Sequence, residues 1–147
     1  MGSERQRAHL EGMQDLDDRF PRRSAAYIMT ALLGIFMAYL AINGAVGPSS
    51  AAHGFGFDLA APADAFYLYV KADRDLAIAI AIFGLLAYRR ATPLLIVTCA
   101  LLVAPICDGT LVTMHHGLGY ALAVHGTAVA YGVALAAVLW RVRRQAR

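Results

Sequence analysis

The chain has 147 residues, of which 59% are hydrophobic and 16% are charged, with a formal net charge of +3. Its mean hydropathy is +0.55. Soluble domains carry about 25% charged residues, so this composition excludes an ordinary soluble domain and favours a membrane protein. Acidic residues alternate with the arginines of the first 23 positions, a pattern that does not indicate nucleic acid as a partner.

Four apolar segments are long enough to cross a membrane as helices. A hydrocarbon core of about 30 Å requires roughly 20 apolar helical residues. We therefore expect an all-α bundle of four transmembrane helices, at about residues 24–46, 66–88, 92–114 and 118–140. Residues 1–23 are expected to form a solvated polar tail without the features of a secretory signal, and residues 141–147 a short basic tail.

The clusters of arginine outside the predicted helices all lie on one side of this arrangement. They precede the first predicted helix, fill the turn at residues 89–90 and follow the fourth helix, whereas the other two connections contain no Lys or Arg. Since Lys and Arg in short loops mark the cytoplasmic side, we expect a multi-pass protein of the cell membrane with both termini in the cytoplasm. The connection at residues 47–65 is rich in Gly, Pro and Phe and is expected to be either a lid over the bundle or an exposed linker.

The second predicted helix carries charged residues within its span. If it began only after them, it would extend about 20 Å, which is too short to cross the membrane. It therefore begins near Phe66. Lys71, Arg74 and Asp75 then share one helical face and are expected to contact protein, because exposing each charge to lipid costs several kcal/mol. Lys71 and Asp75 have the i,i+4 spacing of an ion pair.

Polar residues of the other predicted helices reach the same depth. Counted from the cytoplasmic ends at about 1.5 Å per residue, every helix contributes to one level in the outer third of the bundle. We predict a site whose reacting groups are Arg74, Asp75, Asp108 and His125 and whose lining residues are Tyr39, Asn43 and Lys71. The alternative is a buried network of ion pairs and hydrogen bonds that only holds the helices together.

This set of groups favours acid–base chemistry. Two carboxyl groups beside one Arg cannot both be fully neutralised, so one of them is expected to stay protonated, as general acids do. His125 would act as base, proton shuttle or orienting donor. The predicted ligand is a small lipophilic molecule that undergoes isomerisation, cyclisation or epoxide opening without a cofactor. No metal site is expected, since Asp108 and His115 stand about 10 Å apart along the helix axis.

Two other functions are compatible with the sequence. A proton-coupled small transporter would use Asp75 or Asp108 as its proton carrier, although no inverted repeat is visible. A non-catalytic subunit or assembly partner of a membrane oxidoreductase would need only the buried network. Besides the lipid bilayer, the expected partners are therefore a small lipophilic ligand, a second copy of the chain, or another membrane enzyme.

Small residues and one proline are expected to shape the helices. Stripes of small residues let membrane helices approach closely, and we expect two such stripes to pack inside the bundle. They consist of Ala77, Ala81 and Gly84 on the second helix and of Gly119, Ala123, Gly126, Ala130, Ala134 and Ala137 on the fourth. Pro105 is expected to kink the third helix near the predicted site.

Three sequence motifs resemble those of a known group of proteins. The segment KADRDLAIAI, with ICDG and a later LAVHG, resembles the small four-helix integral membrane proteins of unknown function related to the DoxX-like group. The resemblance covers roughly residues 28–140 and implies Arg74, Asp75, Asp108 and His125 as its signature. It implies a four-helix membrane bundle with no established activity. The wider DoxX group is associated with quinone-linked oxidoreductases, but this chain has no CxxC or other redox motif.

Overall fold

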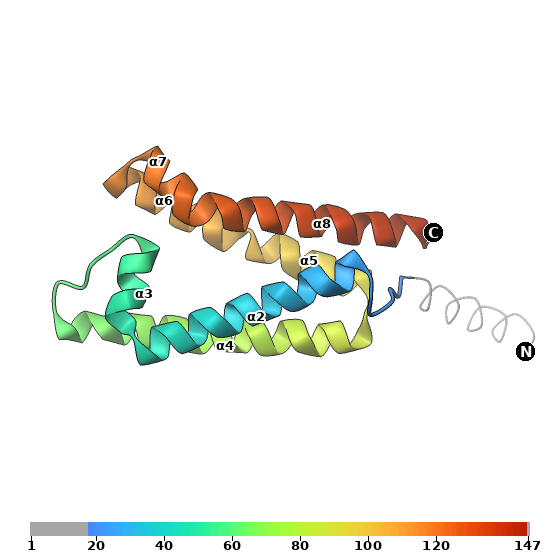
Figure 1. Ribbon diagram of the computed structural model, residues 1–147, viewed down its shortest axis with the longest axis horizontal. Helices are drawn as coiled ribbons and strands as arrows, with labels where there is room; N and C mark the ends of the chain where they lie inside the picture. The colour runs from blue at the N-terminus through green and yellow to red at the C-terminus, as the bar shows by residue number, and fades with distance from the viewer. Residues whose placement is uncertain (1–17, 147) are drawn as a thin grey trace, which may run out of the picture.

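The computed structural model describes residues 18–146, which fold into helices arranged in two layers (Figure 1). One layer contains α2 (Ala25–Val46) and α4 (Ala65–Tyr88), which pack side by side. The other contains α5 (Ala91–Leu101), α6 (Val103–His116) and α8 (Thr127–Gln145). The layers approach each other where α8 ends and diverge toward the opposite end of the molecule (Figure 1). The all-α fold expected from the sequence is confirmed for the described part of the chain.

Shorter helices lie at the end where the layers diverge. They are α3 (Pro48–Phe55), the 3₁₀-helix η1 (Pro62–Asp64), α7 (Leu118–Ala121) and the π-helix η2 (Leu122–Gly126). Pro48 occupies the first turn of α3, where its missing N–H is not needed, and Gly56 ends this helix with a left-handed φ of 108°. The first part of the connection between α2 and α4 therefore forms a short helix.

Three helical segments are long and apolar enough to cross a membrane: Ala25–Val46, Ala91–His116 and Leu118–Gln145. Helix α4 is not one of them, because four charged residues lie in its first half. Its 24 residues nevertheless extend over about 36 Å, the length of a transmembrane helix.

The segment Ala91–His116 is interrupted three residues before Pro105, which was expected to kink it. Helix α5 ends at Leu101 and α6 begins at Val103. Proline lacks the N–H that would bond to the carbonyl group of the residue four positions earlier, which here is Leu101. Asp108 is therefore carried on α6, after the break.

Small residues bring α2 and α4 together, but not those expected to do so. A Cβ atom added to Gly44 would lie 3.1 Å from the Cβ atom of Ala72, so the two helices touch there. The Ala77, Ala81 and Gly84 stripe is exposed, as is most of the stripe on the fourth helix. A Cβ atom added to Gly84 would meet nothing within 4 Å. The expectation that these stripes pack inside the bundle is wrong.

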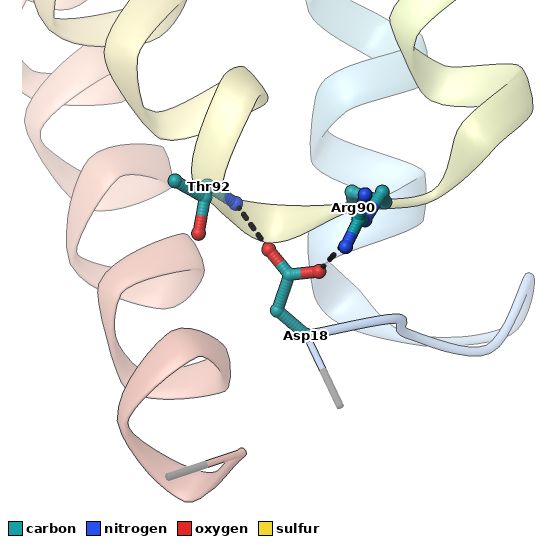
Figure 2. Close-up of polar contacts among 3 residues, drawn as sticks. All are labelled: Asp18, Arg90 and Thr92. Carbon is teal, nitrogen blue, oxygen red and sulfur yellow. Dashed lines mark hydrogen bonds and ion pairs between the residues drawn. The ribbon is translucent and has the colours of Figure 1, made fainter. Parts of the chain in front are cut away.

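Asp18 and Phe20 pack against the bundle instead of belonging to the solvated tail expected for residues 1–23, whereas Arg19 and residues 21–23 are exposed. Residues 1–17 of that tail lie outside the described residues. The Phe20 side chain is 2% exposed and packs in a core with Leu86, Leu94, Leu135 and Leu139. The Asp18 carboxylate accepts hydrogen bonds from the Thr92 backbone N–H at 2.9 Å and from Arg90 Nε at 3.2 Å (Figure 2). This segment therefore clamps the turn between α4 and α5.

The clamp is sensitive to pH. Burial alone would raise the pKa of the Asp18 carboxyl group, but hydrogen bonds from Thr92 and Arg90 outweigh burial and hold this pKa below its ordinary value. The carboxyl group of an Asp in an unfolded chain has a pKa of about 3.9. Because the folded pKa is the lower one, the stability that Asp18 contributes is present above about pH 4 and is lost as the pH falls through the folded pKa.

We expect Asp18→Asn to reduce the free energy of unfolding by about 1–2 kcal/mol at pH 7, because the hydrogen bonds lose their charged acceptor. Denaturant unfolding in detergent micelles measures this difference, which should shrink as the pH is lowered toward 3. Asp58→Asn is the control, since its side chain is 85% exposed and pairs with His53 at the surface. A loss for Asp18→Asn that is equal at both pH values would contradict the charged clamp.

Candidate functional site

Ionisable side chains of α4, α6 and η2 lie within electrostatic range of one another, and α6 and η2 belong to the end where the two layers diverge. Asp75 of α4 is 9% exposed. Its Oδ2 atom accepts a hydrogen bond from Lys71 Nζ at 2.5 Å, which confirms the expected i,i+4 ion pair. Lys71 is only partly buried, with a side chain that is 32% exposed. The pair neutralises a carboxylate that would otherwise be buried alone.

Asp108 of α6 faces the same cluster without a direct partner. Its carboxyl group is half-buried and lies within electrostatic range of His125, Lys71, Asp75 and Arg74. None of the described residues forms a hydrogen bond or ion pair with the Asp108 side chain. The structure therefore brings together the charged groups predicted from sequence, but it pairs only one of the two carboxylates.

His125 belongs to the π-helix η2 and is 8% exposed. Its Nε2 atom is buried and has no hydrogen-bond partner, which is true of no other buried side-chain nitrogen or oxygen atom in residues 18–146. Leaving such a group unpaired costs about 1–3 kcal/mol. π-Helical turns are rare and occur frequently at functional sites. The irregular helix and the unpaired atom thus coincide at one predicted site residue.

Helix α3 and the residues after it cover this histidine. The Phe55 ring packs edge-on against the His125 ring, with centroids 4.9 Å apart. The Phe57 ring packs in the same way against His115 and His116, at 5.4 Å and 5.9 Å. Of the connection at residues 47–65, the part that ends with these two aromatic rings packs over the bundle, whereas residues 60–63 are exposed.

Some predicted site residues lie elsewhere. Tyr39 is 58% exposed on α2, because it is about 200° around the helix from Ala41, which is 5% exposed and faces the bundle. Arg74 is also exposed, and Asn43 is half-buried. These three side chains form no hydrogen bond or ion pair within the described part of the chain. The cluster therefore consists of Lys71, Asp75, Asp108 and His125, with Arg74 at its edge.

Phe55 covers His125, as expected if the Phe-containing connection at residues 47–65 folds back over the bundle. One other site component was not predicted. Gly109 permits the contact between α6 and η2, because a Cβ atom added there would lie 3.4 Å from the Cβ atom of His125. The only sequence feature that points to Gly109 is its position directly after Asp108. Among the described residues, no group of three or more His, Cys, Asp or Glu side chains could hold a metal ion.

The chain belongs to the family described as "Domain of unknown function (DUF4267)", whose model matches residues 34–139. The match includes every predicted site residue. The match agrees with the expectation that the chain belongs to a family of unknown function. The relation of this family to the DoxX-like group stays a prediction. The chain has no significant match among curated proteins or solved structures.

The two carboxylates are expected to respond differently to neutralisation. Asp75→Asn should lower the free energy of unfolding by about 2 kcal/mol, less than the loss for a fully buried pair, because Lys71 is partly exposed. Asp108→Asn should leave the stability unchanged or raise it, because this charge has no ion-pair partner. Thermal unfolding in detergent measures both.

Asp73→Asn is the matched control for these variants, since Asp73 is an exposed carboxylate on α4. A loss of several degrees in Asp108→Asn, equal to that of Asp75→Asn, would show that both carboxylates hold the bundle together and that the cluster is structural.

Proposed function

We propose that this member of the family is a four-helix integral membrane protein that binds a small lipophilic molecule and acts on it by acid–base chemistry. The groups that carry the activity are Lys71, Asp75, Asp108 and His125. The main observation in support is the buried Nε2 atom of His125 without a partner. An unpaired buried group lowers stability, and a bound ligand that supplies the missing hydrogen bond explains why the chain retains it.

Helix α4 crosses the membrane in this proposal, beside α2. The two helices have similar lengths of 24 and 22 residues and pack against each other (Figure 1). The Lys71–Asp75 pair reduces the charge that α4 brings into the bilayer. With four spans, the three arginine clusters, at residues 19–23, 89–90 and 141–144, all lie on one side of the membrane. The positive-inside rule makes that side cytoplasmic, with the site in the outer leaflet.

Labelling of single cysteines in intact cells tests this topology. Ser50→Cys and Gln145→Cys, both at exposed positions, are placed in a chain whose Cys99 and Cys107 are replaced by serine. An impermeant maleimide should label residue 50 in intact cells and residue 145 only after permeabilisation. If α4 did not cross the membrane, the three remaining spans would put both residues on the same side, and both would label alike.

The chemistry needs one proton donor and one proton acceptor close to the ligand. Lys71 and Asp75 pair with each other and contribute a constant electrostatic field at the site. Asp108 and His125 have no such partner, and we assign proton transfer to them. Isomerisation and cyclisation each add a proton at one ligand atom and remove one at another, and hydrolytic epoxide opening adds a proton to the epoxide oxygen and removes one from the attacking water. The acid loses one proton and the base gains one, so a proton transfer from the base back to the acid restores the starting state, and the reaction requires no external oxidant or reductant.

Conversion of endogenous lipophiles tests the proposal. The protein in nanodiscs is incubated with a lipid extract of its expression host, and the products are separated by chromatography and mass spectrometry. We expect one compound to change retention at constant mass, or to gain one water, with a rate that falls by about 100-fold or more in Asp108→Asn and His125→Phe.

Cys107→Ser is the control, because this exposed residue precedes Asp108 on α6. His125→Phe should unfold at the same or a higher temperature than the wild type, since it removes the unpaired atom. Conversion that continues at the wild-type rate in both variants would rule out these groups as acid and base.

A further inference from the structure

An apolar groove lies between α6 and the segment formed by α7, η2 and α8. It has a volume of about 260 Å³, and His125 is one of its lining residues. Most of its other lining residues are apolar, including Pro105, Ile106, Leu118, Leu122 and Val129. Ile106, Leu118 and Leu122 are more than half exposed, so the groove is open along its side to the surroundings of the helices.

The volume of the groove sets the size of what it holds. A water molecule occupies about 30 Å³ in the liquid, and a methylene group fills a similar space, so the groove accommodates roughly nine or ten carbon atoms in a row. In the proposed membrane topology, its open side faces the acyl chains of the outer leaflet. A single apolar chain therefore fits both the volume and the surroundings.

The charges beside the groove set the charge of the ligand. Lys71 and Asp75 neutralise each other in their ion pair, and Asp108 is the protonated acid of the proposed chemistry, so the cluster is neutral with His125 uncharged. A cationic or anionic head group would leave an uncompensated charge at low dielectric, which is costly inside a membrane protein. The cluster therefore favours a neutral head group.

The unpaired Nε2 atom sets the hydrogen-bonding character of that head group. A neutral imidazole donates from one ring nitrogen and accepts at the other, and a hydroxyl group can serve as donor or acceptor for either tautomer. One hydroxyl oxygen is therefore sufficient to satisfy the buried atom.

We propose that the groove and His125 together bind a neutral single-chain lipophile of about ten carbon atoms, whose hydroxyl group forms a hydrogen bond with Nε2. This proposal rests on the proposed function and specifies the ligand class of its site. The Phe55 ring packs against the imidazole, so the hydroxyl group reaches Nε2 only after this ring is displaced. The apolar tail stays in the groove, against Ile106 and Leu122.

Thermal unfolding of the full chain in phosphatidylcholine nanodiscs tests the ligand class, with decan-1-ol, decanoate and decyltrimethylammonium as probes. A ligand that binds the folded state raises the unfolding temperature in proportion to the logarithm of its concentration over its dissociation constant. Decan-1-ol should stabilise the protein at a concentration at least ten-fold lower than either charged probe. Equal stabilisation by all three probes would overturn the assignment of a neutral head group.

Two substitutions test the two halves of the site. Thr110→Trp fills the groove and should raise the half-saturating decan-1-ol concentration by at least ten-fold, whereas Leu111→Trp, an exposed neighbour that does not line the groove, should leave it unchanged. His125→Phe should also weaken decan-1-ol binding by ten-fold or more. If Thr110→Trp has no effect, the groove holds bilayer lipid only and the proposal fails, while loss of conversion in His125→Phe still supports the proposed function.

Phe55→Ala tests the route to the histidine. Removing this ring should lower the half-saturating concentration of decan-1-ol, because the hydroxyl group no longer has to displace it. Phe57→Ala is the matched control, since its ring lies on His115 and His116 instead. An unchanged affinity in Phe55→Ala would contradict the covered position of Nε2.

Discussion

The ion pair between Lys71 and Asp75 is the interaction on which the arrangement of the site depends. Asp75 points into the bundle from the face of α4 that also buries Ala72 and Ala79. One turn away, Ala72 meets Gly44 of α2 at contact distance, so α4 cannot rotate to expose its carboxylate without losing this packing. Lys71 neutralises Asp75 from the preceding turn. The charge can therefore stay inside an otherwise apolar helix pair.

The two ends of the molecule differ in how they are held. At one end, Phe20 and four leucines form a closed apolar core, and Asp18 ties the first described residues to the turn before α5. At the other end, the helix layers diverge, and the space near Asp108 and His125 is covered by a helix of eight residues. Regions with little apolar packing open at low free energy, as ligand-binding elements must. The site therefore lies where the bundle is held least tightly.

Features that depend on local chemistry could be predicted from the sequence. The helix lengths, the break at Pro105 and the Lys71–Asp75 pair each follow from residues within one or two turns of each other. The inward face of each helix could not be predicted, because membrane helices are apolar on all sides and show little amphipathic pattern. For that reason Tyr39 was assigned to the site although it faces outward.

Contacts between segments that are distant in the sequence could not be predicted either. The packing of Phe20 against α8 and of Phe55 against His125 joins residues that are far apart in the chain and carry no shared local signal. The close approach of Gly109 on α6 to His125 on η2 likewise joins separate helices. The depth of the polar residues follows from counting along a helix alone and stays a prediction, whereas their pairing requires the three-dimensional arrangement.

The pattern of satisfied and unsatisfied groups distinguishes a functional cluster from a structural one. Elsewhere in the described bundle, polar groups have near partners: Thr30 Oγ1 donates to the Ala26 carbonyl group, and the Tyr131 hydroxyl donates to the Met29 carbonyl group, each at 2.7 Å. A network selected only to hold helices would satisfy His125 and Asp108 in the same way, since an unpaired group in a bundle lowers its stability. Lys71 and Asp75 of α4 pair with each other, whereas Asp108 and His125, the acid and the base, have no hydrogen-bond partner among the described residues. That asymmetry is expected of a site in which the missing partner is a ligand.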